Sequence, residues 1–146
     1  MTPEQPRLEK TIYIEASPEI VFPFFIDPER MVRWCGESAE LRPEPGGLFK
    51  IQFEGGIVSE GQYVIVEPPR RVVFTVGMTG SAVPVGGSTV EILLTPEGSG
   101  TRLTLRHTGF DPTQPVSEGW EHHLTRLSRA AAGEQLGPDR FVADRS

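Results

Sequence analysis

Residues 116–132 read VSEGWEHHLTRLSRAAA, and this stretch decides the fold. Drawn as an α-helix, it places five apolar residues on one face, because their spacings are four, four, three and four residues. These residues are Val116, Trp120, Leu124, Leu127 and Ala131. The other face is polar, which is typical of a helix packed on a large apolar surface. The sequence therefore predicts one long amphipathic helix near the C-terminus.

Short strands are predicted for residues 39–108, which precede this helix. Apolar and polar residues alternate there, as around Phe49, Ile51 and Phe53, and this period of two is typical of half-buried strands. Turns rich in glycine and proline separate the runs. Residues 77–87, GMTGSAVPVGG, predict a long hairpin loop. The region is expected to form a meander of antiparallel hairpins.

A strand from Leu8 and two short helices are predicted at the start of the domain. Ser17-Pro18-Glu19 and Asp27-Pro28-Glu29 each place a capping residue before a proline and an acid, which is typical of helix starts. Pro23 removes a backbone hydrogen bond in the first helix, so that helix kinks or stays short. We predict an α+β fold in which a sheet of about six or seven strands packs against the long helix.

The length of 146 residues predicts one domain, which buries roughly 68% of the surface that its unfolded chain exposes. We expect a flexible arm over residues 1–7, a single domain over residues 8–136 and a tail over residues 137–146. Prolines and the lack of apolar periodicity set the first boundary.

The formal net charge of -6 argues against nucleic acid and against anionic membrane surfaces, since both favour a basic protein face. Cys35 is the single cysteine, which excludes an internal disulfide. No run of eighteen apolar residues occurs, and no glycine-rich dinucleotide or phosphate loop is present. We expect a soluble cytoplasmic protein without a cofactor.

Several short motifs occur in the order that one known superfamily uses. They are Ala16-Ser17-Pro18-Glu19, Trp34, Gly46-Gly47-Leu48-Phe49, the stretch PPRRVVFT from Pro68 to Thr75, the stretch GTRLTLRHTGF from Gly100 to Phe110, and Gly119-Trp120. With these motifs, residues 8 to 132 resemble the SRPBCC or START-like helix-grip superfamily. Within it, the chain is most similar to the activator of heat-shock protein 90 ATPase homologues.

This resemblance implies a curved sheet wrapped around the C-terminal helix, enclosing a pocket for small apolar molecules. It implies no catalytic group common to the family. Pro23 and the longer loop of residues 77–87 depart from the family pattern, and the cavity is expected to be bordered by Trp34 and this loop.

Three side chains are candidates for proton transfer in such a pocket, namely His107, His123 and Tyr63. Each also has a simpler interpretation, because a hydrogen-bonded histidine at a strand end or a packed tyrosine needs no catalytic role. His122 and His123 diverge by about 100° on a helix, so they do not readily chelate one metal ion. Cys35 has the character of a small buried apolar residue. We assign no catalytic residue and no metal ligand.

The bulky inward residues of the strands and the helix are expected to converge on one enclosed space, and this space is expected to be the largest concavity. The predicted ligand-binding residues are Trp34, Phe49, Ile51, Phe53, Tyr63, Met78, Leu103, Leu105, His107, Trp120, His123, Leu124 and Leu127. Trp120 is predicted to be the largest anchor of the helix on the sheet.

Three functions remain open at this point. The first is binding of a small apolar or aromatic molecule without catalysis. The second is a cyclase or dehydratase type of enzyme that uses His107, His123 or Tyr63. The third is a co-chaperone-like interaction module, for which a chaperone partner rests on analogy alone. The sequence also leaves open whether the protein forms a homodimer through its strand edges.

Overall fold

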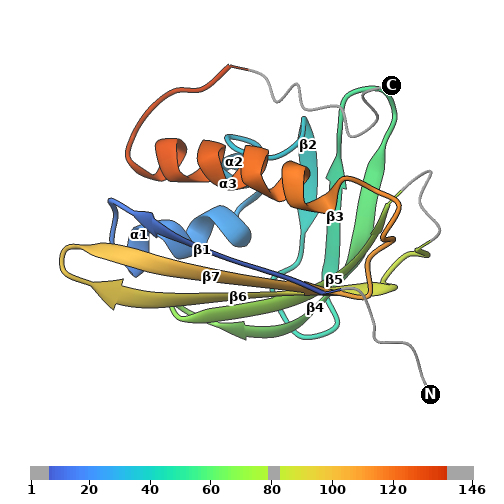
Figure 1. Ribbon diagram of the computed structural model, residues 1–146, viewed down its shortest axis with the longest axis horizontal. Coiled ribbons are helices and arrows are strands. Elements are labelled where there is room, and N and C mark those ends of the chain that lie inside the picture. The colour runs from blue at the N-terminus through green and yellow to red at the C-terminus, as the bar shows by residue number, and fades with distance from the viewer. Residues whose placement is uncertain (1–6, 79–82, 138–146) are drawn as a thin grey trace.

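A seven-stranded antiparallel sheet, in the order β1-β7-β6-β5-β4-β3-β2, forms the frame of the protein (Figure 1). The computed structural model describes residues 7–78 and 83–137. The strands are β1 (Arg7–Ile14), β2 (Ser38–Leu41), β3 (Leu48–Gln52), β4 (Val58–Glu67), β5 (Arg71–Met78), β6 (Ser88–Glu97) and β7 (Gly100–Thr108). Strands β2 to β7 pair in chain order, which confirms the predicted meander. β1 adds beside β7, so β1 and β2 are the two edges.

Two short helical segments follow β1, as predicted. The first is α1 (Pro18–Val21), which continues directly as the 3-10 helix η1 (Phe22–Phe25), and the second is α2 (Pro28–Met31). Pro23 lies at the start of η1. The predicted kink therefore takes the form of a change from α-helix to the tighter 3-10 helix at this point. The Asp27 side chain caps α2 by accepting a hydrogen bond from the Glu29 amide at 3.0 Å.

The long helix α3 (Val116–Ala131) lies across the concave face of the sheet (Figure 1). The predicted apolar stripe faces inward, and its most buried members are Leu124, at 2% exposure, and Leu127, at 0%. Trp120 is only partly buried. Leu124 and Leu127 are therefore more completely buried than Trp120, while Trp120 packs against the core and bonds to His107, so its rank as the largest anchor stays a prediction.

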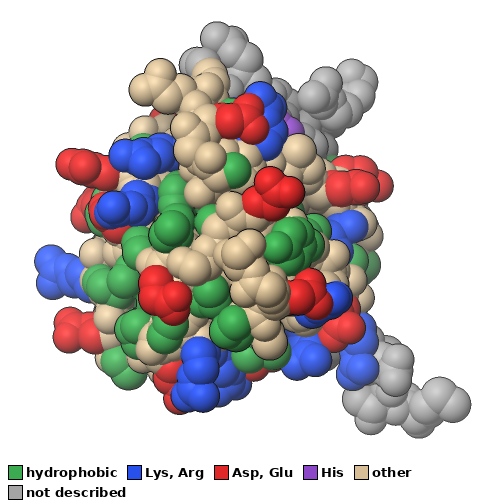
Figure 2. All heavy atoms as spheres, turned by 90° about the vertical axis from the view of Figure 1, so that its left-hand side faces the viewer, with side chains coloured by type: hydrophobic (Ala, Val, Ile, Leu, Met, Phe, Trp, Pro, Cys, Tyr) green, Lys and Arg blue, Asp and Glu red, His purple; other side chains and the backbone are tan. Residues whose placement is uncertain are grey.

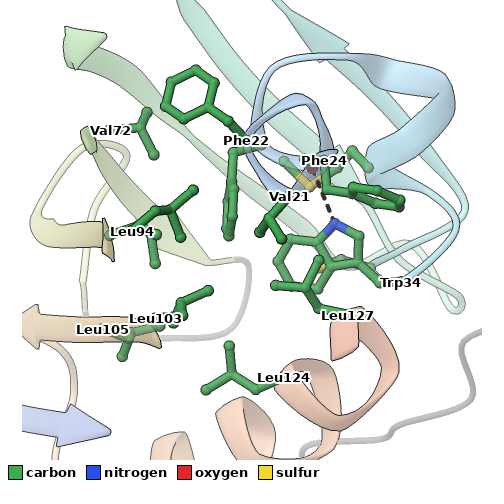
Figure 3. Packing of buried hydrophobic residues seen from close by; sticks show 14 of the residues in the cluster. Val21, Phe22, Phe24, Trp34, Val72, Leu94, Leu103, Leu105, Leu124 and Leu127 are labelled. Atoms are coloured by element: carbon green, nitrogen blue, oxygen red, sulfur yellow. Dashed lines mark hydrogen bonds between the residues drawn. The ribbon is translucent and has the colours of Figure 1, made fainter. Parts of the chain in front are cut away.

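The hydrophobic core lies between the C-terminal half of α3, the short helices and the sheet. Leu124 and Leu127 extend from α3 into the interior, where Val21 and Phe22 lie across from them and Leu103 and Leu105 of β7 lie to one side (Figure 3). Burying a side chain of this size contributes about 1.5–3 kcal/mol relative to leaving it exposed. α1 and η1 thus fill one end of the space that the curved sheet encloses, and the other end is left for a cavity.

The opposite face of the sheet carries ion pairs that cross from strand to strand. Arg106 of β7 donates to Glu9 of β1 at 2.6 Å and to Glu91 of β6 at 3.3 Å, and Arg71 of β5 donates to Glu91 at 2.9 Å. Figure 2 shows another face of the molecule, on which acidic, basic and hydrophobic side chains of the described residues are interspersed.

Some predictions fall outside the residues that the structure describes. These are residues 1–6 of the arm, residues 79–82 of the loop and residues 138–146 of the tail. Arg7, which the sequence assigned to the arm, belongs to β1, where it pairs with Thr108. Phe53 lies just after β3 and not within it.

Candidate functional site

A cavity of about 180 Å³ lies between the N-terminal half of α3 and strands β3, β4 and β5. Eight of the thirteen predicted ligand-binding residues line it. They are Trp34, Phe49, Ile51, Phe53, Met78, His107, Trp120 and His123. Whether they bind a ligand stays a prediction, but the structure brings them to one place.

Aromatic rings form a large part of the cavity wall. Phe49 of β3 stacks on Phe74 of β5, with ring centroids 4.1 Å apart. His123 of α3 packs edge-on against Trp34 at 6.4 Å and lies 5.9 Å from Phe53. Since these rings come from three different parts of the fold, the cavity exists only in the folded chain.

The other five predicted residues do not line this cavity. Tyr63, Leu103, Leu105 and Leu127 are fully buried in the core, and Leu124 lines a different concavity. The four core residues lie at the end of the enclosed space that α1 and η1 fill. Alternation within strands predicts which side chains point inward, but it does not reveal which end of the sheet another element covers.

His107 is the centre of a buried hydrogen-bond chain that joins three strands and α3. The Trp120 indole N–H donates to His107 Nδ1 at 3.0 Å. His107 Nε2 lies 2.9 Å from Ser88 Oγ, and Ser88 Oγ donates to the Val76 carbonyl at 2.7 Å. Because the Ser88 hydroxyl donates its proton to the Val76 carbonyl, it can only accept from His107. The Nε2 atom of His107 therefore carries a proton and donates it to Ser88 Oγ. The ring is the neutral Nε2–H tautomer.

This arrangement determines what His107 can do chemically. Burial lowers its pKa to about 4, because the charged imidazolium loses its hydration in this place. Protonation would also turn Nδ1 into a donor that faces the Trp120 N–H. Both ring nitrogens are therefore occupied by structural hydrogen bonds, which agrees with the simpler interpretation of a histidine at a strand end.

Tyr63 is likewise held by the fold. Its hydroxyl donates to the Phe25 carbonyl at 2.7 Å, which ties β4 to η1. Burial raises the pKa of the phenol above its ordinary value of 10.0. Because Tyr63 does not line the cavity, it is poorly placed for proton transfer there.

His123 is the candidate that remains on the cavity wall with a defined orientation. Its Nδ1 lies 3.0 Å from the Gly119 carbonyl, one turn earlier in α3. A carbonyl only accepts, so Nδ1 carries the proton, and in the neutral ring Nε2 is then an acceptor. Arg126, one turn later, donates to the Trp34 carbonyl at 3.1 Å and so attaches α3 to the segment after α2.

Sequence reasoning missed several lining residues, among them Met31, Cys35, Ser59, Phe74 and Val76. Phe74 and Val76 alternate along β5 and could have been found from that period, whereas Met31 and Cys35 follow no strand pattern. Cys35 is 6% exposed, which confirms the expected burial. Glu54, Ile57, Gln114, Pro115 and Gly119 also line the cavity, and their loop or helix-end positions gave no signal. Val116 lines it too and belongs to the predicted apolar stripe of α3, so the sequence placed it on the inward face without assigning it to the site.

A second concavity, of about 450 Å³, lies between the edge strand β1 and the exposed side of α3. It is lined by polar side chains such as Thr11, Glu121 and Arg129, together with Leu124. The expectation that the aromatic cavity would be the largest concavity is therefore wrong by volume. The cause is that β1, as a free edge, leaves an open surface groove beside the helix.

Neither a metal site nor a membrane span emerges from the described residues. Within residues 7–78 and 83–137, no three histidine, cysteine or acidic side chains come close enough to hold a metal ion. In the same part of the chain, no helix has the length and apolar character needed to cross a membrane.

The curved antiparallel sheet, the helices after β1 and the C-terminal helix define an α+β helix-grip protein of the SRPBCC type. Residues 15–132 match the family model described as activator of Hsp90 ATPase homolog 1-like protein. The chain belongs to this family. No curated protein matches the sequence.

Solved structures support the same assignment. An AHSA1-like protein of Rhizobium etli is 39% identical, with 99% of this chain and 92% of that chain covered and a TM-score of 0.73. CalU16 of Micromonospora echinospora is 30% identical over 88% of this chain and 78% of its own, with a TM-score of 0.69. The Aha1 dimer of Colwellia psychrerythraea is 18% identical over 86% and 96% of the two chains, with a TM-score of 0.73, and shows the fold alone.

Proposed function

We propose that the protein binds a small apolar or aromatic molecule in the cavity between α3 and strands β3 to β5. The observation that carries the proposal is the lining itself. Aromatic and aliphatic side chains from α2, the sheet and α3 surround a space of about 180 Å³. Concave apolar sites with a few polar groups are the usual form of small-molecule sites.

The volume sets the size of the ligand. An engineered apolar cavity of about 150 Å³ in another protein holds one benzene molecule. A cavity of about 180 Å³ therefore suits a ligand with one ring or two fused rings. Larger ligands would have to extend toward solvent, for example past Glu54, an exposed side chain of the lining.

The catalytic alternative has less support. A general acid or base needs a nitrogen or hydroxyl that can exchange a proton with the ligand. His107 and Tyr63 donate their protons to protein acceptors, and Tyr63 lies away from the cavity. His123 alone keeps this role open. The chaperone partner rests on the family description and on no specific contact of the described residues.

Titration calorimetry with 2-phenylethanol and with indole tests the proposal, and native mass spectrometry of the purified protein tests for a carried molecule. We expect saturable binding of at least one probe with a negative heat-capacity change, because apolar surface is buried. Val116→Trp places a large ring at the lining and should abolish binding. Val64→Trp is the matched control, since Val64 is 46% exposed on β4 and does not line the cavity.

Two results would contradict the proposal. One is the absence of binding of both probes to a folded protein that also carries no molecule. The other is unchanged binding by Val116→Trp, which would place the binding site elsewhere.

A further inference from the structure

The polar groups of the cavity wall indicate which charge a bound ligand can carry. Around the aromatic wall, the indole N–H of Trp34 donates to the Phe24 carbonyl at 3.0 Å, and that of Trp120 donates to His107. The ring N–H of His107 donates to Ser88, and that of His123 donates to the Gly119 carbonyl. All four aromatic N–H donors of the wall are therefore directed to protein acceptors.

Cationic side chains are also missing from the wall. None of the described residues that line the cavity is lysine or arginine. Arg126 lies beside Trp34, but its guanidinium donates to the backbone carbonyls of Trp34, Arg33 and Gly137. An anionic head group in the cavity would lose its hydration and find no positive partner, which is costly.

Among the described residues that line the cavity, the one that carries a full charge is acidic. Glu54 lies in the turn between β3 and β4, at the mouth of the cavity, and it is exposed. Its carboxylate only accepts hydrogen bonds, and aromatic rings attract cations through their negative faces. An ammonium group at the mouth therefore meets favourable partners, and a carboxylate meets repulsion.

We infer that the cavity selects uncharged or amine-bearing aromatic ligands and excludes carboxylates and phosphates. This inference rests on the proposed binding function and adds to it the charge class of the ligand. Two features carry it together: Glu54 repels an anion, and the internally bonded aromatic N–H groups leave it without these donors inside. The other polar side chains of the lining, Ser59 and Gln114, are neutral.

Three probes that share one skeleton test the inference at pH 8. They are 2-phenylethylamine, 2-phenylethanol and phenylacetate, which are cationic, neutral and anionic. We expect the dissociation constant of phenylacetate to be at least about tenfold higher than that of 2-phenylethanol. We expect the amine to bind as tightly as the alcohol or roughly threefold more tightly, since an exposed carboxylate contributes little.

Substitutions at the mouth separate the role of Glu54 from the net charge. Glu54→Gln should remove any preference for the amine over the alcohol, and Glu54→Lys should reduce the discrimination against phenylacetate. Glu60→Gln is the control, because Glu60 lies on β4, carries the same charge and does not line the cavity.

The outcomes distinguish the two proposals. Binding of 2-phenylethanol together with equally tight binding of phenylacetate would overturn the charge inference and leave the binding function intact. If neither indole nor any of the three probes binds to a folded protein that carries no molecule, the proposed function fails and this inference fails with it. Weaker binding of phenylacetate, with a smaller difference in Glu54→Lys, supports the inference.

Discussion

His107 is the residue whose surroundings differ most from what its sequence position suggests. It ends an alternating strand, which left open both a catalytic and a structural role. The hydrogen bonds from Trp120 and to Ser88 settle the orientation of the ring. They tie α3 to the sheet through polar contacts inside an apolar region, and such buried contacts stabilise only when every partner is satisfied.

The first prediction at this scale concerns pH. The pKa of His107 falls from 6.5 to about 4 on folding, so the unfolded chain binds more protons within that range. The stabilising contribution is complete above pH 6.5 and is lost as the pH falls toward 4. The shift corresponds to about 3 kcal/mol of unfolding free energy.

Urea unfolding of the wild type and of His107→Gln at pH 7 and pH 4 measures this effect. The other titrating groups contribute similarly to both proteins, so the difference between them isolates His107. We expect the wild type to lose about 3 kcal/mol more than the variant on acidification. Equal losses in the two proteins would show that His107 takes up its proton without cost in the folded state.

At the scale of elements, α3 combines two functions along its length. Its C-terminal half is anchored by Leu124 and Leu127 against the core, and its N-terminal half forms a cavity wall through Trp120 and His123. The division follows from what lies opposite. α1 and η1 supply apolar side chains to the C-terminal half of α3, whereas the N-terminal half faces the curved part of the sheet.

Leu127→Ala tests this division. Leu127 has 0% exposure, and truncation of such a leucine costs about 2–5 kcal/mol because a cavity remains. Chemical denaturation should show this loss, while the affinity for 2-phenylethanol changes little, since Leu127 does not line the cavity. Thr125→Ala on the exposed face of α3 is the control and should change stability by less than about 0.5 kcal/mol. A loss of affinity equal to that of a lining variant would mean that the two halves of α3 are not independent.

At the scale of the whole molecule, the cavity is bounded by α2, three neighbouring strands and α3. A ligand held there contacts parts of the chain that are far apart in sequence, so it binds the folded state and not the unfolded one. Binding of this kind raises stability by mass action.

The corresponding prediction is quantitative. At a concentration of 2-phenylethanol one hundred times its dissociation constant, the unfolding free energy of the wild type should rise by about 2.7 kcal/mol. The shift in the denaturant midpoint measures it. Val64→Trp should show the same rise and Val116→Trp none. A rise of equal size in Val116→Trp would point to a second binding site, for which the groove between β1 and α3 is the first place to look.

The sequence by itself determined the elements of this protein. The spacing of Leu124 and Leu127, the alternation around Ile51 and the proline at position 23 act locally, through helix and strand geometry. For the same reason, the meander order and the inward faces could be predicted, and so could eight of the residues around the cavity.

Only the tertiary structure decided which inward residues became core and which became cavity wall. Leu105 and Phe49 have the same alternation in their strands, yet η1 and α1 fill the space near Leu105 and leave the space near Phe49 open. The roles of His107 and Tyr63 were decided in the same way, by Trp120, Ser88 and the Phe25 carbonyl. These partners come from distant parts of the chain, and local periodicity carries no information about contacts at such separations.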